Sequence, residues 1–169
     1  MNRSLMHLVN TSLVLLAALA LHPATATAQH TSPLVGTWTL TAADVIGPDG
    51  ARTPDYGPHP RGQAIFTADG HYSVDVFRAE RLQFASTDRL RGTAEEYRDA
   101  TLSMSTHFGT YTVDPVKSTI TLRIVSASFP NLDGSTQLRQ YTLVGDALTW
   151  RNPPRPDGSV PLSSFERVR

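Results

Sequence analysis

Only a few residues of this chain have a type and spacing suited to acid–base chemistry. His107, Tyr111 and Tyr141 are the candidates, because imidazole and phenol groups can exchange protons when a fold aims them at one point. His71 and Asp75 also suggest a dyad, but four residues of a strand span about 13 Å, which is beyond hydrogen-bond reach. An enzyme therefore stays an open alternative with no defined reaction.

Arg139 is the most interesting polar candidate for binding a ligand. It shares one face of an expected strand with Tyr141 and Leu143, and an apolar face should point inward. An inward guanidinium would be a buried charge that seeks a carboxylate or another anion. If Arg139 lies near a rim instead, water or an internal acid would satisfy it.

Metal and nucleophilic chemistry have little support in the sequence. There is no cysteine, no H-x-H or H-E-x-x-H spacing, and no G-x-S-x-G turn around a serine. We expect no metal site and no cofactor. For His107 the default role is structural, with its ring near the carbonyl groups at the end of a helix.

The first residues have the layout of a secretory signal peptide. Arg3 precedes an apolar run, Leu13 to Leu21, that is too short to span a bilayer, and Ala26 to Ala28 offers an A-x-A cleavage site. Cleavage after residue 28 would leave 141 of the 169 residues, with 29–33 as a flexible start and 34–169 as one domain. An uncleaved anchor is the alternative. We expect a periplasmic or secreted protein with no membrane attachment after cleavage.

The charges of the chain balance. There are 15 basic and 15 acidic residues, so no large positive field is available to attract nucleic acid or an anionic membrane. This argues against nucleic acid as a partner.

Apolar and polar residues alternate in short runs between turn signals, which is typical of β-strands. About eight such runs predict an antiparallel sandwich or barrel, and a barrel of eight strands holds either one small ligand or only its own side chains. The runs lie at residues 34–41, 63–67, 72–77, 111–113, 120–125, 138–144, 147–150 and 162–168.

One segment between the third and fourth strands breaks this pattern. Thr93 and Glu96 form a capping box, in which each side chain accepts from the backbone of the other residue. Tyr97, Ala100 and Met104 follow at helical spacing, which predicts a single helix of about 13 residues. We expect this helix to lie across an open end of the barrel and to close its cavity.

Several short motifs occur in order along residues 34–169 and together resemble the bacterial and fungal lipocalin-like domain family. The resemblance implies an all-β, eight-stranded antiparallel up-and-down barrel with one short helix. Leu122 and Arg123 stand where many relatives look to have two histidines, so any function of those histidines is in doubt here. The motifs are Gly36-Thr37-Trp38, Tyr56-Gly57-Pro58, Asp69-Gly70-His71, Asp88-Arg89-Leu90, Gly92-Thr93-Ala94-Glu95-Glu96-Tyr97, Phe108-Gly109-Thr110-Tyr111 and Phe129-Pro130-Asn131.

The resemblance also implies a structural role for Trp38. In lipocalins the tryptophan of G-x-W lies near the closed floor of the barrel, and an arginine from the end of the last strand packs across its indole. Arg167 is at that position in this chain. Such a cation–π contact is worth about 0.5–2 kcal/mol.

The sequence therefore favours a protein that binds a small hydrophobic molecule, and an inward Arg139 would add a contact to an anionic group. A small isomerase, cyclase or dehydratase acting inside the same cavity is the alternative, and a barrel filled by its own side chains is a third possibility. The expected lining consists of Trp38, Leu40, Phe66, Tyr72, Val74, Ile124, Arg139, Tyr141 and Trp150.

Overall fold

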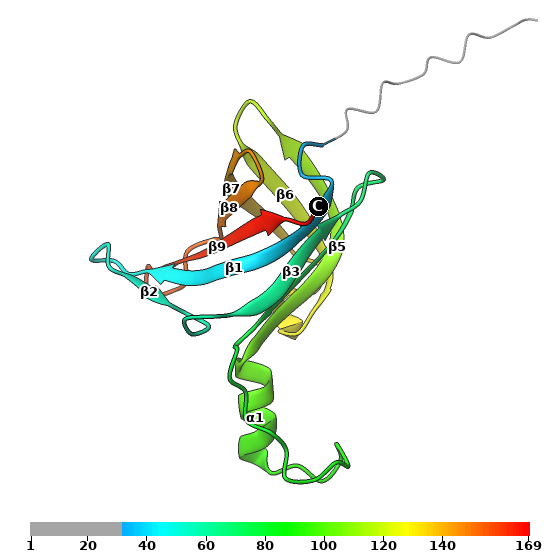
Figure 1. The fold of residues 1–169 in the computed structure, drawn as a ribbon, viewed down its shortest axis with the longest axis vertical. Helices are drawn as coiled ribbons and strands as arrows, with labels where there is room; N and C mark the ends of the chain where they lie inside the picture. The colour runs from blue at the N-terminus through cyan, green and yellow to red at the C-terminus, as the bar shows by residue number, and fades with distance from the viewer. Residues whose placement is uncertain (1–31) are drawn as a thin grey trace, which may run out of the picture. The chain divides into compact units, whose positions relative to one another are not determined.

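The structure, a computed structural model, describes residues 32–169 of the chain (Figure 1). The expected signal peptide (1–28) and residues 29–31 of the expected flexible start lie outside the described residues. The described part contains the following elements in chain order: β1 (Gly36–Ile46), β2 (Arg52–Pro54), β3 (Arg61–Phe66), β4 (His71–Phe77), α1 (Ala94–Leu102), β5 (Met104–Asp114), β6 (Thr119–Ala127), the 3-10 helix η1 (Pro130–Leu132), β7 (Thr136–Val144), β8 (Ala147–Arg151) and β9 (Val160–Arg167).

The strands form one antiparallel sheet that closes on itself. Each strand from β3 to β8 pairs with the next, and β1 pairs with both β3 and β9, so eight strands complete the barrel. The ninth strand, β2, pairs with the end of β1 at Asp44–Ile46. The predicted eight-stranded antiparallel barrel is confirmed. The helix lies between β4 and β5 rather than between strands 3 and 4, because β2 was not expected and raises the numbering by one.

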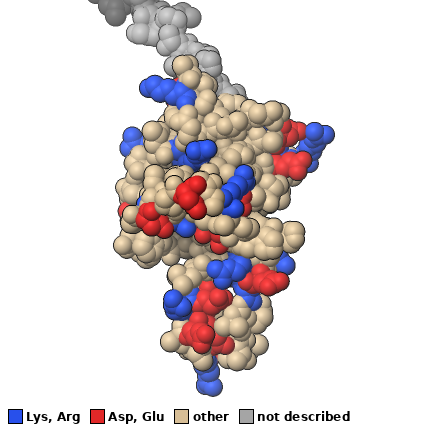
Figure 2. All heavy atoms as spheres, turned by 90° about the vertical axis from the view of Figure 1, so that its left-hand side faces the viewer, with Lys and Arg blue, Asp and Glu red and all other residues tan. Residues whose placement is uncertain are grey.

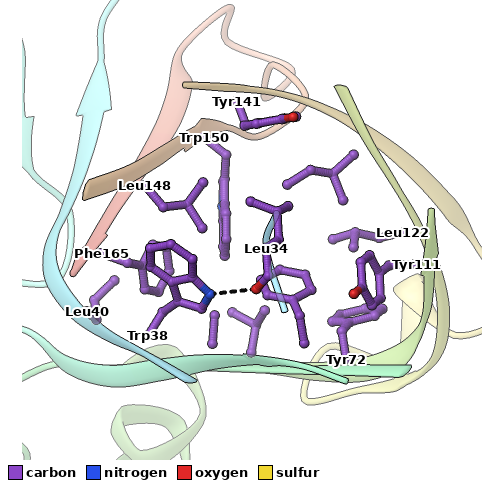
Figure 3. Packing of buried hydrophobic residues seen from close by; sticks show 14 of the residues in the cluster. Leu34, Trp38, Leu40, Tyr72, Tyr111, Leu122, Tyr141, Leu148, Trp150 and Phe165 are labelled. Carbon is purple, nitrogen blue, oxygen red and sulfur yellow. Dashed lines mark hydrogen bonds between the residues drawn. The ribbon is translucent and has the colours of Figure 1, made fainter. Parts of the chain in front are cut away.

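The interior is filled by apolar side chains toward the end where β1 begins (Figure 3). Trp38 and Leu34 have no exposed surface, and the indole Nε1 of Trp38 donates to the carbonyl oxygen of Leu34 at 2.8 Å. Phe66, Trp150 and Phe165 pack above them, each at most 2% exposed. Side chains therefore close this end of the barrel, and any space for a guest lies toward the other end.

Helix α1 does not cover the barrel, contrary to the sequence expectation. It extends away from the end of the β4–β5 hairpin in Figure 1, because β4 and β5 stay paired up to Phe77 and Met104. The loop before the helix holds it there: the backbone amide of Leu82 donates to Asp99 at 3.1 Å, and the ring of Phe84 packs edge-on against Tyr97. The helix is also shorter than expected and ends at Leu102.

The predicted capping box is present at the start of α1. Glu96 N donates to the Thr93 hydroxyl at 3.2 Å, and Thr93 N donates to the Glu96 carboxylate at 2.6 Å. The carboxylate also accepts from the amide of Ala85 at 2.7 Å, so it joins the helix to the preceding loop. These backbone donors hold the pKa of Glu96 below its usual value.

We expect Thr93→Ala to loosen α1 without weakening the barrel. Loss of a threonine cap costs about 0.5–2 kcal/mol, so amide exchange in residues 94–102 should become several times faster where the helix opens locally. Hydrogen exchange followed by mass spectrometry checks this. Thr101→Ala, an exposed threonine in the same helix, is the control. Equal exchange in the two variants would contradict the role of the cap.

Candidate functional site

A cavity of about 470 Å³ opens at the end of the barrel opposite Trp38. Its walls come from the ends and connections of β1, β4, β5, β7, β8 and β9, and no residue of α1 contributes to it. The apolar lining consists of Val76, Phe129, Leu162 and prolines after β8 and in β9. Polar residues come from β1, the connection between β2 and β3, β5, β7 and the segment after β8. The polar lining residues used below are Asp44, Asp55, Tyr56, Ser105, His107, Gln137, Arg139, Asn152 and Arg155.

Arg139 of β7 lies in the inner wall of this cavity and is only 4% exposed. Its Nη2 donates to Oε1 of Gln137 at 2.8 Å and contacts Nε2 of His107 at 3.0 Å. The guanidinium carbon lies 5.4 Å from the ring centroid of Trp150. All three neighbours are uncharged polar or aromatic groups, so the arginine is held in place without a counter-charge from them.

His107 of β5 joins Arg139 to Tyr72 of β4. Its Nδ1 lies 3.0 Å from the Tyr72 hydroxyl, and the residue is 5% exposed. Because a guanidinium can only donate, Nε2 must accept from Arg139, and the neutral ring carries its proton on Nδ1 and donates to Tyr72. The expected position of His107 at a helix end is wrong, because α1 ends at Leu102 and His107 lies inside β5.

The three candidates for proton transfer are not brought together. The Tyr111 hydroxyl donates to the carbonyl of Thr67 at 3.0 Å, at the filled end of the barrel. Tyr141 pairs with Trp150 across β7 and β8 and does not line the cavity. Of the three, only His107 reaches the cavity. The rejected pair, His71 and Asp75, alternates with the buried residues of β4, and His71 is exposed.

Most residues of the expected lining belong to the packed interior. Of that set only Arg139 lines the cavity of about 470 Å³, which we call the mouth cavity. Tyr72 contacts the lining residue His107 through its hydroxyl. Whether any of the set contacts a ligand stays a prediction. The others are buried with at most 8% exposure: Trp38, Leu40, Phe66, Val74, Ile124, Tyr141 and Trp150.

Several cavity residues were not predicted from the sequence. Gln137 could have been found, since it is two residues before Arg139 on the same face of one strand. Tyr56 and Asn152 lie outside the regular strands, where no periodicity indicates which way a side chain points. The buried Oδ1 of Asn152 has no hydrogen-bond partner among the described residues.

A comparison with protein-family models identifies the fold family. The model described as "Lipocalin-like domain" matches residues 35–162, which is most of the chain. The chain belongs to the lipocalin-like domain family. This confirms the resemblance seen in the sequence motifs.

Comparisons with curated proteins and with solved structures give no further information on function. No curated protein matches this lipocalin-like domain. Among solved structures, it is similar to a lipocalin-like protein from Bacteroides uniformis ATCC 8492, with a TM-score of 0.42 and 16% identity over 80% of this chain and 98% of that one.

Burial sets the protonation states in the mouth of the lipocalin-like domain. Burial, helped by the positive charge of Arg139, lowers the pKa of His107 to about 3. Burial also raises the pKa of Tyr72 to about 12, although the same cation opposes the rise. Near neutral pH the imidazole and the phenol are therefore both uncharged, and neither exchanges a proton easily.

Two ion pairs flank the opening of the lipocalin-like domain. Asp55, in the connection between β2 and β3, pairs with Arg155 in the connection between β8 and β9. Asp44 near the end of β1 pairs with Arg52 of β2. On the face shown in Figure 2, basic and acidic side chains are interspersed, in agreement with the balanced composition. Both acids that line the cavity are thus already paired with arginines at its edge.

Within residues 32–169, no group of three or more His, Asp or Glu residues is arranged to hold a metal ion. No helix in that range has the length and apolar character to cross a bilayer.

The floor of the lipocalin-like domain has the arrangement that the G-x-W motif implies. The Arg167 guanidinium carbon lies 4.0 Å from the centroid of the Trp38 ring, and the two residues are paired across β1 and β9. Arg167 also donates to the carbonyls of Pro33 and Val35, both at 2.8 Å. The cation therefore ties the start of the domain to its last strand.

Proposed function

We propose that this lipocalin-like domain binds a small, mainly apolar molecule in the mouth cavity. The observation that carries the proposal is the cavity itself, whose volume of about 470 Å³ falls in the range of small-molecule sites. Its walls combine apolar side chains such as Phe129 and Leu162 with a few polar groups, which is the usual composition of such sites. The filled interior behind it limits the guest to one of modest size.

The proposal includes a location outside the cytoplasm, in the periplasm or secreted. Its support is the charged start, apolar run and A-x-A site of the first 28 residues. Mass measurement of the protein purified from its own host tests this, because cleavage after Ala28 predicts a chain that begins at Gln29.

Native mass spectrometry of that same preparation tests the binding. We expect an additional mass of a small molecule that is lost on denaturation. Ser105→Leu, which fills part of the cavity from β5, should reduce retention at least tenfold (about 1.4 kcal/mol). Thr112→Leu, an exposed position of the same strand, is the control and should retain the molecule. Equal retention in both variants would contradict binding in this cavity.

One observation favours the alternative of a small isomerase, cyclase or dehydratase. His107 lies 3.0 Å from the enclosed hydroxyl of Tyr72, which is a geometry that proton transfer could use. The shifted pKa values of both groups weigh against it, since efficient acid–base catalysts titrate near the working pH. Binding is therefore the favoured function.

The two functions give different results with His107→Gln. A binding protein should retain the same molecule in the variant and in the natural protein. An enzyme that needs the imidazole should accumulate its unconverted substrate, so the two preparations should carry different molecules. Because isomerisation and cyclisation leave the mass unchanged, the released molecules are compared by chromatographic retention as well as by mass.

A further inference from the structure

Arg139 is a buried cation without an acidic partner. Its only hydrogen bonds within residues 32–169 come from Nη2 and go to Gln137 and His107, and its buried Nε has no partner. No carboxylate in that range forms an ion pair with it. Removing a charge from water without a counter-charge is costly, and burial accordingly lowers the pKa of Arg139 to about 10. It still carries its charge near neutral pH.

The acids nearest to the cavity do not supply the missing charge. Asp44 and Asp55 both line the cavity, but Asp44 pairs with Arg52 and Asp55 pairs with Arg155. The groups that surround Arg139 are Gln137 on its own strand, His107 on β5 and the ring of Trp150 on β8. The cavity thus combines an unpaired cation in its inner wall with acids that are neutralised at its edge.

The neutral neighbours fix the guanidinium rather than neutralise it. The His107 ring accepts from Arg139 and donates to Tyr72, so it holds Nη2 in one direction. Trp150 packs against the guanidinium from a ring that is 1% exposed. An arginine that is held in this way loses little side-chain freedom when a partner binds to it.

We propose that Arg139 binds the anionic group of the guest, which is a small organic acid with a single negative charge and an apolar body. This inference rests on the proposed function and names the class of its ligand. One guanidinium neutralises one negative charge, whereas a doubly charged group would bring an unpaired charge into the cavity. The apolar body then contacts Phe129, Leu162 and the prolines of the wall.

Two matched probes test the inference on the protein without its leader: naphthalene-2-carboxylate and naphthalene-2-carboxamide. They have nearly the same shape and differ in charge. Isothermal titration calorimetry at about pH 7 should give at least tenfold tighter binding of the carboxylate. Acetate should compete only weakly, which distinguishes an organic acid from a free small anion.

Gln137→Glu provides a variant that leaves Arg139 in place. Oε1 of Gln137 already lies 2.8 Å from the guanidinium, so a glutamate there becomes an internal counter-charge. We expect this variant to lose the tenfold preference for the carboxylate, so that the two probes bind with nearly equal affinity. Gln140→Glu, an exposed position on the same strand, is the control and should keep the preference. Arg139→Gln should lose the preference as well.

The outcomes separate the two proposals. Equal binding of both probes by the natural protein would overturn the anion site and leave the binding function standing. An unchanged preference for the carboxylate in Gln137→Glu would also overturn the role of Arg139. Failure of both probes to bind would overturn the proposed function itself.

Discussion

Trp38→Ala is expected to lower the free energy of unfolding by about 3–5 kcal/mol, the usual cost of truncating a buried large aromatic side chain. Trp38 has no exposed surface, its indole donates to the Leu34 carbonyl at 2.8 Å, and its ring lies under Arg167. The substitution would leave a void at the floor of the barrel and an unpaired backbone carbonyl. Urea denaturation of the two proteins measures the difference.

A double-mutant cycle separates the cation–π contact from the packing. Arg167→Ala, Trp38→Ala and the double variant should show a coupling energy of about 0.5–2 kcal/mol, because the two side chains touch. Arg169→Ala is the control, since Arg169 is exposed and pairs with Asp146 as Arg167 does. Strictly additive losses for Trp38 and Arg167 would show that the contact contributes nothing.

Lowering the pH from about 7 to about 5 is expected to cost the natural protein about 2 kcal/mol of stability through His107. The pKa of this ring is about 3 in the folded protein and 6.5 in an ordinary environment. Between these values the unfolded chain binds a proton that the folded chain does not, so stability is full above the higher value and falls as the pH falls. Protonation of His107 would also place a hydrogen on Nε2, which could then no longer accept from the Arg139 guanidinium.

His107→Gln removes this titration and should be nearly insensitive to pH over the same window. Urea denaturation at both pH values checks it, with His59→Gln, an exposed histidine, as the control. The lowered pKa values of carboxylates such as Asp69 and Asp114 affect stability only at lower pH. If lowering the pH destabilised His107→Gln as much as His59→Gln, His107 would not be the source of the pH dependence.

The strands of the barrel were predictable because alternation reports burial directly. On β4 the expected inward set of Tyr72, Val74 and Val76 is at most 6% exposed. The short strand β2 was missed because all three of its residues are exposed, so no alternation marks them. The start of α1 was predictable from Thr93 and Glu96, which act locally.

The direction of α1 was not predictable, because it depends on contacts made by the loop before it. Leu82 and Phe84 bind and pack against the helix from positions that show no periodic pattern. The apolar stripe of the helix was expected to pack on the open end of the barrel, but its residue Tyr97 packs on Phe84 instead. The direction of a helix relative to a barrel thus depends on contacts that hydrophobic periodicity does not indicate.

The candidate site was predictable only where strand parity was sufficient. Parity put Arg139 on the inward face of its strand. It could not pair His107 with Tyr72, since that contact depends on the register of β4 against β5, in which His107 lies opposite Val74 and diagonal to Tyr72. The rim residues Tyr56 and Asn152 come from connections between strands, where parity has no meaning.

Among the described residues, Trp38 and Leu34 close one end of the barrel, and the cavity opens at the other end. Under the proposed function, a guest would enter and leave through this open end, and the water that it displaces would leave by the same route. Asp55 and Arg155 form an ion pair among the residues that line this cavity, so a guest would pass beside them. Under that proposal, the ion pair at the opening would affect the rate of exchange, and Arg139 would affect the affinity.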